Sequence, residues 1–280
     1  MSRSIENLFA PNQSKLLGAT VGIEVVAVEL DGIGQLDLGI AMKFHFSQSP
    51  DSDALRAAFA EQGYVHIPAV LPDDSASRLH KALVEETPWN LAFHDGEKHV
   101  DMTAEELGQL DREALNRLQQ SIFSRARDAF QYSYHSYPIF DAVSAGINDG
   151  HLLHGLYEWL NSDEFVGFAR AVTGFDDITF VDAQATRYSP GQFLNLHDDI
   201  QEGKNRRAAY IFNFTPQWRP DWGGYLQLID DQGNVRRGLA PSFNALNIIS
   251  IPQRHSVSFV TPFAGAFRFA VSGWFRHGAA

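Results

Sequence analysis

The sequence predicts an α+β protein in which a helical half precedes an antiparallel β-sandwich or barrel. Between Asp51 and about Leu160 apolar residues recur three and four positions apart, as they do on amphipathic helices. After Gly174 the chain changes to short β-type runs separated by turn sequences such as SPGQ, PDWGG and DDQGN. Six or more short strands with this spacing are typical of an antiparallel sandwich or barrel.

Each helix is expected from a local signal. The segment DSDALRAAFAEQG ends at Gly63, a glycine of the kind that closes helices, and a short strand, YVHIPAVL, follows it. Pro and Asp residues open the next helix, PDDSASRLHKALVEE. Residues 103–132 predict one or two amphipathic helices, and residues 151–174 predict two more, broken near Asn161 and closed by Gly174.

The domain organisation follows from a change of texture near the N-terminus. Residues 1–41 combine apolar and acidic residues with several glycines, and we expect them to form an extension outside the domain. Residues 42–280 are then a single domain, with a helical part over 51–174 and a β core over 177–276. The 280 residues are 44% hydrophobic, enough for a well-buried core.

Composition excludes several classes of function. The chain has no Cys, so disulfides, thiolate metal sites and Cys nucleophiles are excluded, and a metal must bind His, Asp or Glu. A net charge of -12 disfavours non-specific electrostatic binding to the nucleic-acid backbone. No signal-like segment and no apolar run of the roughly 18 residues that span a membrane is found. The sequence thus predicts a cytoplasmic protein without membrane contact.

A candidate metal site lies in the segment FLNLHDDIQEGKNRR. His197 and Asp199 are two residues apart, so on an extended strand both side chains lie on one face and converge on one ion. His255, at the start of a later strand, supplies a third ligand. Two His and one carboxylate leave open positions on the metal, as in non-haem Fe(II) oxygenases. His-x-Asp alone is weak, because a surface histidine is an equally good interpretation of His197.

A candidate co-substrate site accompanies it. Arg268 and Ser272 share one face of the last strand, and an arginine that faces into a barrel needs an anion. The distal carboxylate of 2-oxoglutarate is a two-pronged partner for it, and Tyr188 can donate its hydroxyl to the same carboxylate. The alternatives are an outward-facing edge charge for Arg268 and a core position for Tyr188.

Other polar and aromatic residues stay open to two interpretations. His151, His154 and Glu158 share one face of a predicted helix, but a di-iron bundle needs a matching motif on a second helix, so an ordinary amphipathic helix is favoured. His94 and His99 are expected in a loop. A third group of residues either lines the substrate mouth or packs on the barrel: Trp218, Trp222 and Tyr225.

Several motifs in order carry a resemblance to a known family. HDD within residues 187–228, the distal His of PSFNALNIISIPQRHSVSFV, and RFAVSGWF resemble the catalytic domain of prolyl-hydroxylase-like 2-oxoglutarate oxygenases that modify a ribosomal protein, with their bacterial relatives. The resemblance covers roughly residues 179–276. It implies a double-stranded β-helix, or jelly-roll, with supporting helices packed on one sheet. It also implies Fe(II) on His197, Asp199 and His255, and 2-oxoglutarate held by Arg268 and Tyr188.

The resemblance further implies the reaction. Fe(II), 2-oxoglutarate and O2, with ascorbate as an additional reductant, hydroxylate an unactivated C–H bond and release succinate and carbon dioxide. Asp198 is expected to face away from the metal. One departure concerns the co-substrate site, where Ala270 replaces a serine that the family usually has two positions after the arginine.

The substrate and partners stay open at this point. A prolyl residue in a protein or peptide is favoured, and a free amino acid or small metabolite is the alternative. Two further alternatives are a jelly-roll binding protein without catalysis and a cupin-type metal enzyme that uses no keto-acid. The sequence does not predict the oligomeric state.

Overall fold

The computed structural model describes residues 42–278; the extension expected over residues 1–41 lies outside them. The helices are α1 (Ser52–Gln62), α2 (Asp73–Glu85), α3 (Ala104–Gly108), α4 (Arg112–Asp128), α5 (Ile139–Ser144), α6 (Leu152–Leu160), α7 (Asp163–Thr173) and the 3₁₀ turn η1 (Pro220–Trp222). The strands are β1 (Tyr64–Ile67), β2 (Asn90–His94), β3 (His99–Met102), β4 (Tyr132–Tyr137), β5 (Phe180–Val181), β6 (Gln184–Tyr188), β7 (Phe193–His197), β8 (Arg206–Asn213), β9 (Leu226–Ile229), β10 (Val235–Leu239), β11 (Ala245–Ser250), β12 (His255–Val257) and β13 (Arg268–Arg276).

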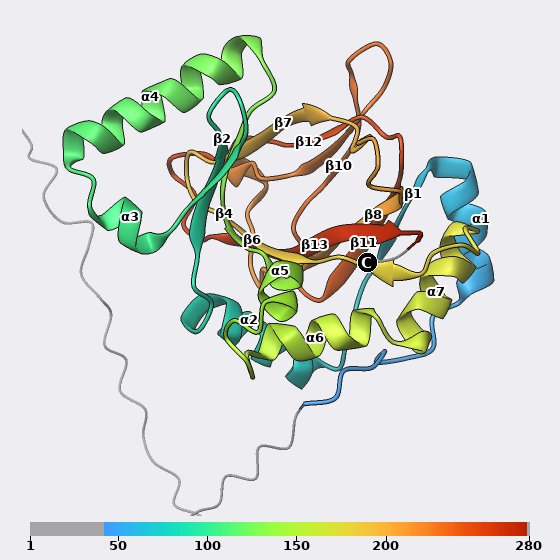
Figure 1. Ribbon diagram of the computed structural model, residues 1–280. Helices are drawn as coiled ribbons and strands as arrows, with labels where there is room; N and C mark the ends of the chain where they lie inside the picture. Colours follow the sequence, from blue (N-terminus) through green and yellow to red (C-terminus); the bar gives the residue numbers. More distant parts are fainter. Residues whose placement is uncertain (1–41, 279–280) are drawn as a thin grey trace, which may run out of the picture. The chain divides into compact units, whose positions relative to one another are not determined.

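The strands form a curled antiparallel sheet, so the predicted α+β class with an antiparallel core is confirmed (Figure 1). Its order is β1-β11-β8-β13-β6-β4-β7-β12-β9-β10, with β2 and β3 added beside β4 and β5 beside β13. The β6–β7 turn carries the chain from β13 on one side of the fold to β12 on the other, and β4 pairs with both β6 and β7. The curled sheet therefore has two layers with an interior between them.

The two faces of strand β13 have different environments: one faces the apolar core and the other faces a cavity. Phe269, Val271 and Phe275 are buried in the main apolar core, which they share with helices α2, α6 and α7. Arg268 and Trp274 lie on the opposite face and line a cavity inside the curled sheet. Because side chains alternate along a strand, one strand serves both the core and the cavity.

The helices cover the outer face of the β13 layer on one side, with α2, α5 and α6 beneath it in Figure 1. Gly63 and Gly174 adopt the left-handed conformation at the ends of α1 and α7, as predicted for glycine stops. Helix α4 lies on the other side of the molecule, next to β2 and β4 (Figure 1). In residues 42–278 no helix has the length and apolar content to cross a bilayer.

The part predicted as helical over 51–174 also contributes strands β1 to β4 to the sheet, and only the first of them is expected from the sequence. The sequence of β4 is YSYHSY, which lacks aliphatic residues, and β3 is HVDM, which is polar and half exposed. Neither segment has the alternating apolar pattern that predicts a strand. They form strands because they pair with other strands of the sheet, and the sequence of the segment itself does not show this pairing. The predicted helix over 103–132 ends at Asp128, and Tyr132 is already the first residue of β4.

Gln131 ties the β2–β3 hairpin to the start of β4. It is fully buried; its Nε2 donates to the carbonyl oxygen of His94 at 2.8 Å, and its Oε1 accepts from the backbone N–H of His94 at 3.0 Å. The same oxygen accepts from the N–H of Tyr132 at 2.9 Å. From α4, Arg125 donates to the carbonyl oxygen of Asp95 in the hairpin turn at 2.8 Å. The hairpin is therefore anchored from two sides.

We expect Gln131→Ala to lower the free energy of unfolding by about 2 to 3 kcal/mol, because it leaves buried backbone groups of the hairpin without partners. Urea denaturation measures this loss. Amide hydrogen exchange is also expected to accelerate selectively over residues 90–102. Gln120→Ala, at an exposed position on α4, is the control and should change stability by less than about 0.5 kcal/mol. Equal effects of the two substitutions would contradict the role of Gln131 as a clamp, that is, as the residue whose hydrogen bonds hold the β2–β3 hairpin to β4.

Candidate active site

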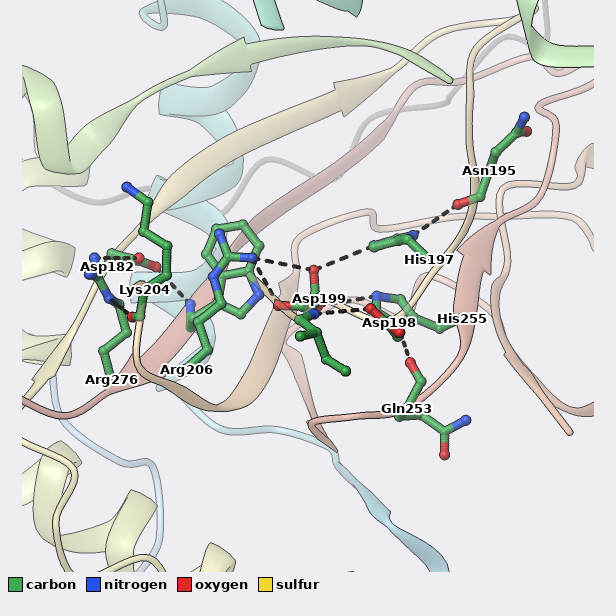
Figure 2. A network of polar contacts seen from close by, with 12 residues as sticks. Asp182, Asn195, His197, Asp198, Asp199, Lys204, Arg206, Gln253, His255 and Arg276 are labelled. Carbon is green, nitrogen blue, oxygen red and sulfur yellow. Dashed lines mark hydrogen bonds and ion pairs between the residues drawn. The ribbon is translucent and has the colours of Figure 1, made fainter. Parts of the chain in front are cut away.

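Three potential metal ligands meet where β7 and β12 pair. His197 is the last residue of β7, His255 is the first residue of β12, and the two are direct partners in the antiparallel register. Their ring centroids are 4.0 Å apart. Asp199 follows β7, and one potential ligand atom of each of the three side chains lies within 4.8 Å of the others. Figure 2 shows both imidazoles directed at the Asp199 carboxylate.

The hydrogen bonds of both histidines fix which ring nitrogen faces the carboxylate. His197 Nδ1 lies 2.8 Å from the carbonyl oxygen of Asn195, and His255 Nδ1 lies 2.7 Å from that of Gln253 (Figure 2). A carbonyl oxygen only accepts, so each Nδ1 carries the proton and each Nε2 keeps a free lone pair. Those Nε2 atoms are 3.5 and 3.4 Å from the two Asp199 oxygens. This donor set fits a divalent metal.

Burial supports the same protonation state for His197. Burial, and after it the neighbouring His255, lowers the pKa of His197 to about 4. The imidazole is therefore neutral near pH 7, which is the form that binds a metal.

Asp199 reaches the site by a route that differs from the predicted one. The sequence analysis places His197 and Asp199 on one face of an extended strand, but β7 ends at His197 and Asp199 has a φ of 64°. Aspartate tolerates this left-handed conformation better than most residues. Arg206, at the start of β8, donates to the Asp199 carbonyl oxygen at 3.1 Å and stacks 3.5 Å above the ring centroid of Trp274. The sequence analysis did not identify Arg206, which carries no motif of its own.

Arg268 is buried inside the curled sheet, so the alternative of an outward-facing edge charge is wrong. It is 2% exposed and lies opposite Tyr188 of β6 in the strand register. Its guanidinium carbon is 4.9 Å from the Tyr188 ring centroid, and burial raises the pKa of Tyr188 to about 12. The Nε atom of Arg268 is buried and has no hydrogen-bond partner in the part of the chain that the structure describes. A buried guanidinium in this state calls for an anionic ligand.

One cavity, here called the inner pocket, joins the candidate metal ligands to Arg268. It is lined by residues of both groups and by the side chains between them: His197, Asp199, His255, Arg268, Tyr188, Ser272, Thr186, Tyr134, Gln184 and Trp274 among others. Ala270 is fully buried, and its strand partner Thr186 places a hydroxyl in the pocket wall. Thr186 on β6 therefore supplies a hydroxyl next to position 270, where the family usually has a serine.

A second cavity, here called the outer chamber, opens beside the candidate ligands. Its wall includes His94, His99, Phe130, Tyr132, Tyr134, Leu196, His197, Asp198, Asp199, Ile200, Arg206 and Trp274. Three apolar residues on its rim are notably exposed: Phe130 at 45%, Leu196 at 43% and Ile200 at 65%. The predicted loop positions of His94 and His99 are wrong, since these residues lie on β2 and β3.

The remaining candidates have structural roles. His154 Nε2 is 2.8 Å from the Tyr137 hydroxyl, and His151 Nδ1 accepts from the backbone of Leu153 at the start of α6. Within residues 42–278, His197, Asp199 and His255 are the one group arranged to hold a metal. Trp218 packs edge-on against Trp222 and donates to the carbonyl oxygen of Gly223, so the WRPDWGG tryptophans pack on the barrel.

Comparisons with known proteins agree with the fold and the order of the motifs. Residues 183–276 match the family model of the 2OG-Fe(II) oxygenase superfamily. The chain is 32% identical over 120 residues to mouse prolyl 3-hydroxylase OGFOD1, covering 40% of this chain and 22% of that protein. It is 32% identical over 112 residues to prolyl 3-hydroxylase sudestada1 of Drosophila melanogaster, covering 35% of this chain and 20% of that protein. The matched part thus spans about a fifth of these relatives.

Solved structures share the fold at low sequence identity. A Pseudomonas putida prolyl-4-hydroxylase aligns with a TM-score of 0.54 and 16% identity, covering 82% of this chain and all of that one. A Trichoplax adhaerens prolyl hydroxylase, in complex with a hypoxia inducible factor peptide fragment, aligns with a TM-score of 0.53 and 14% identity, covering 81% and 89% of the two chains. The predicted double-stranded β-helix is confirmed.

The matched segment contains β6 to β13, and with them both pairs of strands that bring the histidines, the aspartate and the buried arginine around one cavity. Residues 183–276 resemble the 2OG-Fe(II) oxygenase superfamily, and the chain is similar to proteins named prolyl hydroxylases.

Proposed function

We propose that the chain is an Fe(II)- and 2-oxoglutarate-dependent dioxygenase that hydroxylates a prolyl residue of a protein or peptide. One observation carries the proposal: two histidines with free Nε2 atoms, a carboxylate and a buried guanidinium without an anion share the inner pocket. A metal and a dicarboxylate together satisfy all of these groups.

The residues divide into two sets of roles. His197, Asp199 and His255 would hold Fe(II), while Arg268 would bind the distal carboxylate of 2-oxoglutarate with hydroxyl support from Tyr188 and Ser272. When bound, iron, 2-oxoglutarate and oxygen supply the oxidation of a C–H bond, with release of succinate and carbon dioxide. The side chains bind, orient and exclude water, and the reaction needs no general base among them. Ascorbate serves as an auxiliary reductant.

The outer chamber supports a peptide substrate. Its rim exposes Phe130, Leu196 and Ile200. Tyr132 and Trp274 add aromatic rings to its wall, and aromatic-lined surfaces bind proline-containing segments. The similar OGFOD1 and sudestada1 are named prolyl 3-hydroxylases, which favours a prolyl target. A free amino acid would leave this exposed apolar rim unused. A single domain over 42–280 and a cytoplasmic location stay predictions.

The metal site is tested by substituting two of the proposed ligands and, as a control, the carboxylate next to them in the sequence. Asp199→Ala and His197→Ala are expected to lower Mn(II) affinity by at least about 100-fold and to abolish succinate release, because each removes one of three ligands. Asp198→Ala is the matched control: its carboxylate accepts from the Ile200 N–H at 3.0 Å and does not belong to the ligand group. Isothermal titration with Mn(II) and a succinate assay give the two readouts. Unchanged metal affinity in Asp199→Ala would reject the assignment.

The co-substrate site is tested at Arg268. Arg268→Ala should raise the KM for 2-oxoglutarate about 100-fold, since it removes a buried charged partner of a carboxylate, while Mn(II) affinity stays unchanged. Arg207→Ala, which removes an exposed arginine paired with Asp177, is the control. If the chain is instead a cupin-type metal enzyme that uses no keto-acid, neither Arg268→Ala nor Arg207→Ala should change its activity.

A further inference from the structure

A chain of three polar side chains runs across the β2–β3 hairpin toward the outer chamber. The Asp101 carboxylate lies 2.8 Å from His99 Nε2, and His99 Nδ1 lies 2.6 Å from the Tyr132 hydroxyl. Ser136 donates to the other Asp101 oxygen at 2.6 Å. The imidazole thus has a carboxylate on one nitrogen and a phenol on the other.

The strand register explains how residues on non-adjacent strands make these contacts. β3 pairs only with β2, and β2 separates β3 from β4. On β2, Ala92 lies between Asp101 on one side and Tyr134 on the other. Because alanine has no side chain beyond Cβ, Asp101 can reach over β2 to Ser136. His99 lies opposite His94 in the register and contacts Tyr132 from there.

Tyr132 is placed to meet a molecule in the outer chamber. It lines the chamber together with His197 and Arg206, and its ring packs against Phe130 at 5.6 Å and Tyr134 at 5.5 Å. The roles assigned in the proposed function leave Tyr132, His99 and Asp101 unused.

The state of His99 decides which way the Tyr132 hydrogen points. Asp101 fixes a proton on Nε2, so neutral His99 has a lone pair on Nδ1 that accepts the Tyr132 O–H. When His99 is protonated, Nδ1–H donates to the Tyr132 oxygen, and the Tyr132 O–H is free to donate into the chamber. The hydrogen bond to Asp101 raises the pKa of His99 against the opposing effect of burial, which favours the second state.

A prolyl substrate needs a donor at this place. Proline has no backbone N–H, so the backbone of the prolyl residue itself offers only its carbonyl oxygen, which accepts. We propose that the Tyr132 hydroxyl contacts a carbonyl oxygen of the peptide substrate, and that His99 and Asp101 are positioning residues that turn its hydrogen toward the chamber. This inference rests on the proposed function for the class of substrate.

Other charged groups face this chain of side chains and must be considered. They are His94, Asp95 and Lys98 on the hairpin and His197, Asp198, Asp199 and Arg206 across the chamber. Asp95 and Asp101 both raise the pKa of Tyr132, after burial, to about 12. Tyr132 therefore stays protonated through the neutral range, and His99 is the member of the series that titrates there.

The test measures binding of a fluorescein-labelled peptide with one central proline between alanine and glycine residues. Fluorescence anisotropy with the 280-residue chain, Mn(II) and 2-oxoglutarate gives Kd from about pH 5.5 to about pH 9, the range that spans histidine titration. In the wild type, Kd should be low while His99 is protonated and rise as it deprotonates. Tyr132→Phe should raise Kd about tenfold at low pH and remove this dependence. Asp101→Asn should move the rise in Kd to lower pH.

A matched control keeps the test separate from stability and from catalysis. Tyr137 lies on the same strand and bonds His154 at 2.8 Å, away from both cavities, so Tyr137→Phe should leave the pH profile of Kd unchanged. Succinate release without peptide should persist in Tyr137→Phe. A wild-type Kd that does not change with pH, or parallel profiles in wild type and Tyr132→Phe, would overturn the inference. Absence of succinate release from the wild type, with the expected pH profiles of Kd, would instead reject only the proposed oxygenase.

Discussion

The antiparallel pairing of β7 with β12 is the constraint on which the site depends. It puts His197 directly opposite His255, and the hydrogen bonds of both Nδ1 atoms to backbone carbonyls turn both Nε2 atoms inward. A shift of one residue in this register would send one imidazole to the opposite face of its strand. Ligand geometry in this fold is therefore a property of sheet pairing before it is a property of side chains.

The second constraint is the burial of Arg268. Burying a guanidinium costs several kcal/mol unless its donors are satisfied. The protein supplies the Tyr188 ring and hydroxyl, and among residues 42–278 Arg268 Nε has no hydrogen-bond partner. The fold thus carries a local cost that a dicarboxylate would offset, which links binding of a co-substrate to the stability of β13.

The elements that could be predicted from the sequence are those that local signals decide. The glycine stops at 63 and 174 and the face of β13 that carries Arg268 were predictable, because local sterics and alternation decide them. The conformation of Asp199 was not, because a left-handed aspartate after a strand has no composition signal. β4 was missed for a related reason: its tyrosines and serines gain their burial from β2, β6 and β7, which the chain reaches at very different sequence distances.

The same limit applies to contacts between elements. Arg206 bonds the Asp199 backbone and stacks on Trp274, and nothing in the sequence around it distinguishes it from the neighbouring Arg207 on the surface. His99 and Asp101 have the spacing of a metal pair but meet a tyrosine and a serine instead. Only the register of three strands separates these outcomes.

The clamp formed by Gln131 has a consequence for the thermodynamics of recognition. It fixes the hairpin that forms one wall of the outer chamber, and Arg125 fixes the turn of that hairpin. Backbone that is already ordered loses little conformational entropy when a ligand arrives, whereas a floppy wall would lose about 1 to 2 kcal/mol for each residue immobilised. This conformational entropy is lost during folding, so binding of a ligand in the outer chamber does not have to offset it again.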